Sequence, residues 1–540
     1  MKDITTTKIK FIAILKLCMV ILYLPACGNG KVEQHNTKPV VAIYSSENTT
    51  ELTLDSLGII KFFKTFPASD SIKKEVYQFY KSRDYQFAWL SENGLTVAAS
   101  IFFEQIKSDS RDFADKTLRN VQLDSLYEDA ILNESVFISQ KDKAEQIELL
   151  LTTSFFKYAT KMYGGITSES KSLEWYIPRK KKNYQALLDS LVSLSVGETI
   201  QEPVNEYYIR LKEKLKAYRI IQKNSGLPLL ITGKKLFITG DKDSFLLKVK
   251  EYFFITGDLK VNDNTFLFTD SLQNAVKNYQ KRMGLPITCK IDIATIREMN
   301  KPIDVRIMQI MINMERLRWV PVEMENNYLL VNIPEFRLHV FENNKQVWAT
   351  NVVVGKAIKQ TSIFRDNISQ IILNPYWNVP ASITRIEILP HLKKNSDYLE
   401  NNNMEVVSQK PFVVRQKPGA DNALGKVKFL FPNNYNIYLH DTPSKNLFGE
   451  TKRAFSHGCI RVENPFWLVQ YLLRKDAYWT NEKIDSILQN NKEFTININP
   501  VVPVYIAYFT AWVDNTGEIN FRNDLYGLDK KLSKEIFSVK

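Results

Sequence analysis

The spacing of apolar residues changes part-way along this chain of 540 residues, and that change limits the folds the chain can adopt. Before about residue 320 the apolar side chains recur at helical spacing. Ile147, Leu150, Leu151, Phe155 and Ala159 show this spacing in one strong segment. After about residue 328 apolar and polar residues alternate, which is the period of a half-buried strand. The sequence therefore predicts a multidomain α+β protein with a helical N-terminal part and a β-rich C-terminal part.

Composition shifts and turn signals divide the chain further. The predicted segments are a lipoprotein-type signal peptide (1–27), a flexible tether (28–65), a helical scaffold (66–235), a small helical module (236–302), a connecting helix (303–327), a β-rich domain (328–512) and a strand-like C-terminal tail (513–540) packed on that domain. Polar, turn-rich sequence at 381–427 interrupts the strand pattern. We expect it to be a lid-like insertion over a site, with a passive loop as the alternative.

The N-terminus has the pattern of an export signal. Lys8 and Lys10 precede the apolar stretch 11–24, which is too short to span a bilayer comfortably and is typical of a signal peptide. The stretch ends Leu-Pro-Ala-Cys-Gly at 24–28, which resembles a bacterial lipoprotein signal. This resemblance implies cleavage before Cys27 and lipidation of its thiol. We expect a membrane-anchored lipoprotein on the periplasmic side of the cell envelope.

The four cysteines do not form a disulfide framework. Cys18 falls within the signal and Cys27 carries the expected lipid, which leaves Cys289 and Cys459. We expect Cys289 to be a buried packing residue, because free cysteine behaves as a small hydrophobe. Cys459 lies in a more informative setting.

Cys459 follows Ser456, His457 and Gly458, and a second histidine, His440, lies shortly upstream. A free thiol with a pKa of about 8.5 is mostly protonated at neutral pH, and the thiolate is the reactive form. A nearby histidine can take that proton, and a glycine lets the backbone approach a substrate closely. The pattern predicts a thiol nucleophile with its base; the alternative is a buried cysteine near satisfied histidines.

The net charge of +13 raises the question of anionic partners. We expect no nucleic-acid partner, because the sequence has no basic repeat and no recognisable nucleic-acid module. An anionic polymer or a membrane surface fits the charge equally well. No residues have zinc-ligand spacing, and a thiol–imidazole pair needs no metal, so we expect no cofactor.

Several motifs together resemble the L,D-transpeptidase family, with a catalytic domain of the YkuD type. They are His440 with the Ser456–Cys459 motif, Val-Asn-Ile-Pro at 331–334 and Asn-Pro-Tyr-Trp-Asn-Val-Pro at 374–380. Residues 272–285 and the ending Asp292, Thr295 and Asn300 resemble the small helical peptidoglycan-binding domain, except that its usual members carry a glycine near Cys289. The resemblance is to the large subgroup with a helical scaffold and a lid-like insertion.

The resemblance implies a mechanism. Cys459 would attack the carbonyl of the diamino acid at position three of a stem tetrapeptide, and the terminal D-alanine would leave. The side-chain amine of a second stem would resolve the thioester into a 3→3 cross-link. His440 would be the base, held by the carbonyl of Asp441, with His457 as a second polar partner. The N–H groups of Gly458 and Cys459 would bind the oxyanion.

The resemblance also implies substrate contacts and ligands. Arg461 could bind a substrate carboxylate through two hydrogen bonds, and Tyr438 could line the pocket. Further candidates for substrate binding are Ser456, Trp377 and Arg453. The expected partners are peptidoglycan stem peptides, as donor and acceptor, with carbapenem-type β-lactams as inhibitors. Two alternatives stay open: an L,D-carboxypeptidase that resolves the same thioester with water, and a non-catalytic wall-binding lipoprotein.

Overall fold

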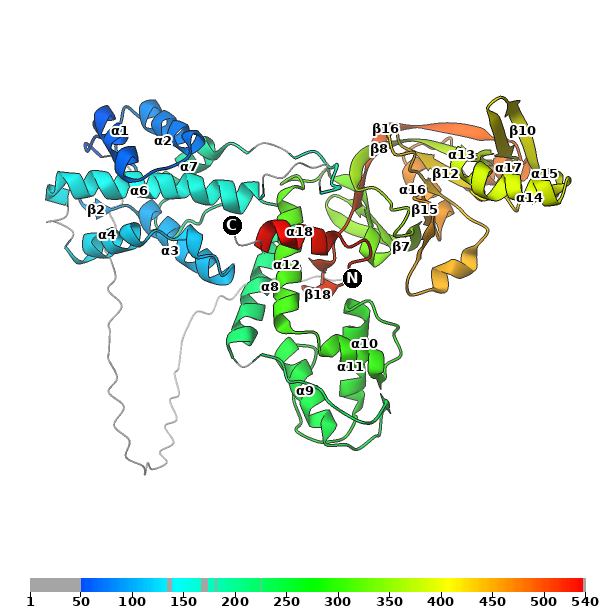
Figure 1. Ribbon diagram of the computed structural model, residues 1–540, viewed down its shortest axis with the longest axis horizontal. Coiled ribbons are helices and arrows are strands. Elements are labelled where there is room, and N and C mark those ends of the chain that lie inside the picture. Colours follow the sequence, from blue (N-terminus) through cyan, green and yellow to red (C-terminus); the bar gives the residue numbers. More distant parts are fainter. Residues whose placement is uncertain (1–49, 134–137, 167–172, 180–181, 225, 538–540) are drawn as a thin grey trace, which may run out of the picture. The chain divides into compact units, whose positions relative to one another are not determined.

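The computed structural model describes residues 50–133, 138–166, 173–179, 182–224 and 226–537 (Figure 1). The predicted signal peptide, its Cys27 and the first part of the predicted tether lie outside the described residues. Within the described ranges, no helix is both long and apolar enough to cross a membrane. The predicted fold class is confirmed, because a helical N-terminal region precedes a β-rich C-terminal domain.

The N-terminal region is built around one long helix, α6 (Lys141–Ala159), which continues through the π-helical turn η2 (Thr160–Gly164). In Figure 1, α6 lies between α1 and α2 on one side and α3 and α4 on the other, and all four contact it. The surrounding elements are α1 (Ser56–Thr65), α2 (Asp70–Ser82), the hairpin β1 (Leu90–Ser91) and β2 (Gly94–Leu95), α3 (Val97–Asp112), η1 (Lys116–Leu118), α4 (Val121–Leu132), α7 (Tyr184–Val192) and α8 (Glu206–Lys223).

The prediction of a tether up to residue 65 is wrong for its last part. Residues 56–65 form α1, capped by Asp55, whose carboxylate accepts a hydrogen bond from the Leu57 N–H. Ile59 and Phe62, three positions apart, are buried against the rest of the helical region. This one-sided apolar pattern is short and directly follows polar sequence, so the sequence did not predict a helix here.

The helical module that follows contains α9 (Phe245–Thr256), α10 (Asp270–Arg282) and α11 (Ile293–Met299), together with the short pair β3 (Leu236–Phe237) and β4 (Ile291–Asp292). Helix α10 is capped by the hydroxyl of Thr269, which accepts a hydrogen bond from the Leu272 N–H. The connecting helix α12 covers Ile303–Arg318.

Cys289 is not the buried packing residue that we expected. It is half-buried in the turn between α10 and β4, and its φ of 58° lies in the left-handed region. The side chain of Gln280 accepts a hydrogen bond from its N–H at 2.9 Å, which holds this conformation. The left-handed region favours glycine, so glycine would fit this position of the turn with less strain than cysteine.

The β-rich domain is a nine-stranded sheet in the order β14-β7-β15-β13-β12-β8-β16-β5-β6, with β6 also paired to β7, so that the order closes on itself. Its strands are β5 (Asn327–Asn332), β6 (Arg337–Glu342), β7 (Lys345–Gly355), β8 (Phe364–Leu373), β12 (Val427–Leu430), β13 (Leu439–His440), β14 (Ala454–Ser456), β15 (Ile460–Val462) and β16 (Phe494–Ala507). Helices α16 (Pro465–Leu473) and α17 (Asn481–Gln489) separate β15 from β16.

The segment 381–427 is a small folded unit rather than a loop. It contains α13 (Ala381–Ile383), η4 (Thr384–Ile388), α14 (Leu389–Lys394), α15 (Tyr398–Asn401) and the hairpin β10 (Met404–Gln409) and β11 (Phe412–Gln416), which extends onto β9 (Trp377–Asn378). Its apolar cluster of Val379, Ile383, Ile388 and Val414 is separate from the main core. These elements gather together in Figure 1.

The tail differs from the prediction in form and in position. After the hairpin β17 (Ala511–Val513) and β18 (Ile519–Phe521) it ends in a helix, α18 (Leu528–Phe537). The hairpin and α18 pack on α12, α8 and α10, whereas we expected packing on the β-rich domain. The buried ion pair between Arg316 of α12 and Asp529 of α18 (2.6 Å) is one reason, because each of these charges needs a partner when buried. Tyr526 of the tail donates a hydrogen bond to the carbonyl of Gly355 in β7.

Candidate active site

Three neighbouring strands bring His440 between two basic residues. Lys428 on β12 lies directly opposite His440 on β13, and His440 lies beside Arg461 on β15. Directly paired residues share one face of a sheet, so the three side chains form a row. The preceding residues on β13 and β15, Leu439 and Ile460, point the other way into the core.

The backbone fixes the orientation of His440. Its Nδ1 lies 2.5 Å from the carbonyl oxygen of Asp441, the contact that we expected. A carbonyl only accepts, so Nδ1 carries the proton and Nε2 keeps its lone pair. The Asp441 carboxylate is itself held by the N–H of Lys426 (2.9 Å) and the ammonium of Lys445 (2.7 Å).

Burial lowers the pKa of His440 from 6.5 to about 3, and the nearby charges of Arg461 and Lys428 act in the same direction. The imidazole is therefore neutral at pH 7 and available as a base. Because the pKa in the folded state is the lower one, this group's contribution to stability is complete above pH 6.5 and is lost as the pH falls toward 3.

The Cys459 thiol is also neutral at rest. Burial raises its pKa, while hydrogen bonds from Tyr438 and the charges of Lys428 and Arg461 lower it. Among the described residues, its hydrogen-bond acceptor is the carbonyl of Asn436 at 3.5 Å and not the imidazole of His440. The side chain is partly exposed, so a substrate can reach it.

Hydrogen bonds shape the turn before Cys459. The Ser456 hydroxyl donates to the Cys459 carbonyl (2.6 Å) and accepts from the Gly458 N–H (3.2 Å). Gly458 has a φ of 122°, which other residues rarely adopt. The expected oxyanion donor Gly458 is thus already paired, whereas the Cys459 N–H has no acceptor among the described residues. Ser456, which we expected to touch substrate, is buried and stabilises the turn.

The loop after β7, which contains Thr361, stabilises the same turn through hydrogen bonds that the sequence did not reveal. The buried Thr361 hydroxyl donates to the Gly458 carbonyl (2.8 Å) and accepts from the Gly355 N–H (2.9 Å). Tyr526 of the tail in turn donates its hydroxyl proton to the Gly355 carbonyl (2.8 Å) and accepts from the Thr361 N–H (3.3 Å).

Neither basic residue of the row forms an ion pair with a described residue, although the charge of Glu493 acts on Lys428. Arg461 forms no ion pair with any described residue, and its buried Nε has no hydrogen-bond partner. Burial lowers the pKa of Arg461, and the adjacent Cys459 opposes this shift. The Lys428 ammonium lies 4.1 Å from the centre of the Tyr438 ring. The site is therefore electropositive and suited to a thiolate or a carboxylate.

Lys428 could not be recognised as a site residue in the sequence, because the register of two strands puts it in the row. Its place between the buried Val427 and Phe429 indicated only that it faces away from the core. Lys428, Asn436 and Tyr438 also line a cavity of about 360 Å³, and the carbonyl of Asn436 accepts the hydrogen bond from the Cys459 thiol.

Three predicted residues lie at the edge of this arrangement or away from it. His457 is exposed, and its Nε2 lies 3.5 Å from the Glu387 carboxylate of the insertion. Trp377 packs against the apolar cluster of the insertion. The guanidinium of Arg453 donates to the backbone carbonyls of Glu450 (2.7 Å) and Phe336 (3.1 Å), so its contacts are structural in this conformation.

Comparison with known proteins identifies the domain that carries this site. Residues 326–502 match the L,D-transpeptidase catalytic domain, and residues 74–215 match a scaffold domain. Residues 326–502 belong to the YkuD family of L,D-transpeptidase catalytic domains. A Haemophilus influenzae protein whose name assigns it to the L,D-transpeptidases is 32% identical over 239 residues, which is 41% of this chain and 48% of that protein. The chain thus spans about half the length of this relative.

Solved structures of L,D-transpeptidases are also similar, at low scores. One from Enterococcus faecium is 11% identical, covers 34% of this chain and 50% of its own, and has a TM-score of 0.19. One from Stackebrandtia nassauensis is 13% identical, and the match covers 51% of this chain and 97% of that protein, with a TM-score of 0.22. Neither likeness is close enough to bear on the assignment, which rests on the match of the catalytic domain.

Across the described part of the chain, no group of three or more histidine, cysteine, aspartate or glutamate side chains is arranged to hold a metal ion.

Proposed function

We propose that this protein is an L,D-transpeptidase that forms 3→3 cross-links between peptidoglycan stem peptides through a thioester on Cys459. The proposal is supported by an accessible thiol, a neutral imidazole, and two cations that form no ion pair with a described residue, all in a domain that matches the L,D-transpeptidase family.

In the acylation step, the Cys459 sulfur attacks the carbonyl carbon of the third residue of a donor tetrapeptide. His440 takes the thiol proton as the S–C bond forms and gives it to the nitrogen of the departing D-alanine as the C–N bond breaks. The proton moves with the attack, because burial disfavours a resting thiolate–imidazolium pair.

This step requires the thiol to turn from the Asn436 carbonyl toward His440. Such hydrogen bonds are often loose or misdirected before substrate binds, so the distance at rest does not weigh against the base. The free Cys459 N–H is the candidate donor to the oxyanion.

In the second step, the side-chain amine of an acceptor stem attacks the thioester carbonyl. His440 takes the amine proton and returns it to the departing sulfur, so the free thiol is regenerated and an amide joins the two third residues. Water in place of the amine would make the enzyme an L,D-carboxypeptidase, and access for the acceptor decides between them.

Arg461 is the proposed partner of a donor carboxylate, because its buried Nε has no acceptor and a charge-assisted pair would supply one. Tyr438 and Lys428 line the cavity that includes Asn436 and are proposed to position the donor stem. The module 236–302 is proposed to bind peptidoglycan, and lipidation of Cys27 to hold the chain on the periplasmic side of the envelope. A carbapenem-type β-lactam is expected to acylate Cys459.

The test is product analysis with disaccharide tetrapeptide and residues 44–540, which form one compact unit. The proposal predicts free D-alanine and 3→3 dimers in equal amounts. Tripeptide without dimers would assign a carboxypeptidase. No release of D-alanine, from wild type or from the matched Cys289→Ala variant, would contradict the proposal and favour a non-catalytic wall-binding role.

A further inference from the structure

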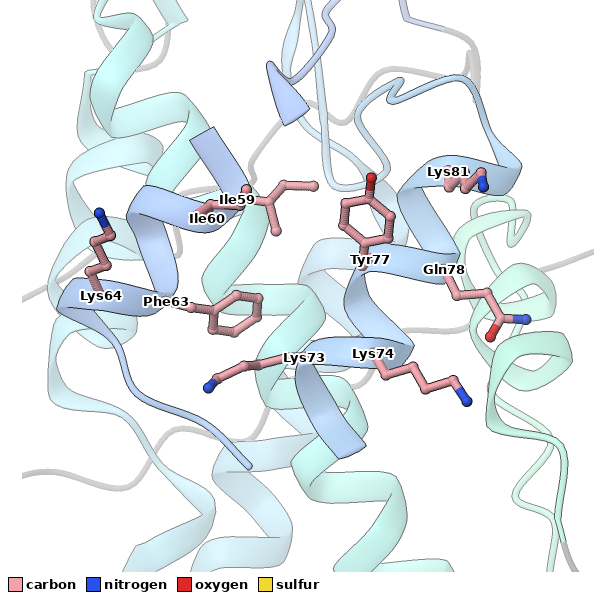
Figure 2. Close-up of a pocket in the computed structure, with 9 residues that line it drawn as sticks. All are labelled: Ile59, Ile60, Phe63, Lys64, Lys73, Lys74, Tyr77, Gln78 and Lys81. Atoms are coloured by element: carbon pink, nitrogen blue, oxygen red, sulfur yellow. The ribbon is translucent and has the colours of Figure 1, made fainter. Parts of the chain in front are cut away.

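A groove between α1 and α2 combines an apolar floor with a basic rim (Figure 2). It has a volume of about 620 Å³, and its apolar lining includes Ile59, Ile60 and Phe63 of α1 and Tyr77 of α2. Figure 2 shows Phe63 and Tyr77 between the two helices. The groove lies in the helical region and uses none of the active-site residues.

Part of the groove's apolar lining is open to solvent, and the apolar surface continues beyond the groove at Leu57. Leu57 is 60% exposed, Ile60 54% and Tyr77 42%. Leu57 and Ile60 are three positions apart, so they form one stripe on the outer side of α1, opposite the buried Ile59 and Phe62. Helix α1 is therefore apolar on the face toward the protein and also on part of the face toward solvent.

Lysines surround this apolar surface. Lys64, Lys74 and Lys81 line the groove and form no ion pair with any described residue, while Lys73 pairs with Asp70 at 3.1 Å. The other acid on these two helices, Glu75, accepts a hydrogen bond from Gln185 (2.6 Å). The surface thus has a positive charge excess next to exposed apolar side chains.

We propose that the α1–α2 face binds the surface of a membrane that contains anionic phospholipids. An interfacial helix places its apolar side chains at the boundary of the acyl region while lysines contact the headgroups, and both features are present here. A soluble polyanion would neutralise the lysines but leave Leu57 and Ile60 in water. The predicted lipid attachment at Cys27, close upstream of α1 in the sequence, agrees with this orientation but is not needed for it.

The test is flotation of residues 44–540, which lack any lipid, with vesicles of phosphatidylcholine alone or with added phosphatidylglycerol. We expect binding only to the anionic vesicles, weakened by salt. Each lysine near such a surface is worth about fivefold in affinity, so the triple variant Lys64→Gln, Lys74→Gln and Lys81→Gln should bind roughly a hundredfold more weakly. Ile60→Ser should also weaken binding.

The matched control removes the same charge elsewhere. Lys248, Lys260 and Lys277 are exposed lysines of the module 236–302, and changing all three to glutamine should alter binding by less than the first triple variant. Circular dichroism checks that each variant is folded. Equal losses in the two triple variants, equal binding to neutral vesicles, or full binding by Ile60→Ser would each overturn the proposal.

Discussion

Replacing Thr361 by valine tests whether the hydrogen bonds of its hydroxyl stabilise the turn that carries Cys459. Valine keeps the shape of threonine but removes the hydroxyl, which joins the Gly458 carbonyl (2.8 Å) to the Gly355 N–H (2.9 Å). Thr361 is only 2% exposed, so water does not replace the lost bonds. Both backbone groups would remain buried without a partner.

The expected cost follows from those two groups. Each buried polar group that loses its partner costs ~1–3 kcal/mol, so the variant should lose about 3 kcal/mol of stability in the catalytic domain. At 2–4 °C per kcal/mol for a domain of this size, this loss lowers the melting temperature by roughly 6–12 °C. Because Gly458 precedes Cys459, the proposed nucleophile, kcat/KM for D-alanine release should fall at least tenfold, equivalent to about 1.4 kcal/mol.

The matched control is Thr153→Val in α6. The Thr153 hydroxyl is buried, like that of Thr361, but has no hydrogen-bond partner in the described structure. Removing it should leave the melting temperature unchanged or raise it slightly, with full activity. The reasoning is refuted if both variants melt alike, or if Thr361→Val lowers the melting temperature while kcat/KM stays at the wild-type value.

Three further perturbations probe other parts of the account. The wild-type free energy of unfolding should fall by about 2.5 kcal/mol between pH 7.5 and 4.5, because the pKa of His440 is lowered from 6.5 to about 3. His440→Gln should abolish this fall. Urea unfolding that gave equal pH slopes for wild type and variant would contradict the prediction. Cys289→Gly should stabilise the chain by about 1 kcal/mol, because φ is 58° at this position; a lower melting temperature would show that the turn is not strained. Glu387→Gln should change the rate of D-alanine release at pH 7 less than twofold, because its pair with His457 is largely open to solvent. Partial burial also lowers the pKa of His457, which disfavours the charged imidazole that the pair needs. A tenfold loss of rate would give Glu387 another role.

The parts of the fold that could be predicted are those in which local pattern and final structure agree. The alternation after residue 328 predicted β5, β6 and β7. The contact between His440 and the carbonyl of its neighbour Asp441 is also local. The roles of His440 and Cys459 remain predictions.

What escaped prediction depends on contacts between distant segments. Lys428 faces His440 only because β12 pairs with β13 in one register, and Thr361 reaches Gly458 only because two loops meet. The conformation at Cys289 depends on the side chain of Gln280, which no residue-by-residue pattern reveals. The strand-like pattern of the tail did not indicate its final helix, whose buried Asp529 is paired with α12.

The central claim is that Cys459 is the nucleophile, and trapping the acyl-enzyme tests it most directly. Residues 44–540 would be mixed with disaccharide tetrapeptide, quenched in acid, and analysed by intact mass and by peptide mapping. The account predicts a tripeptide adduct on Cys459, absent from Cys459→Ala and unchanged in Cys289→Ala. An adduct on Cys289, or an adduct that persists in Cys459→Ala, would contradict it.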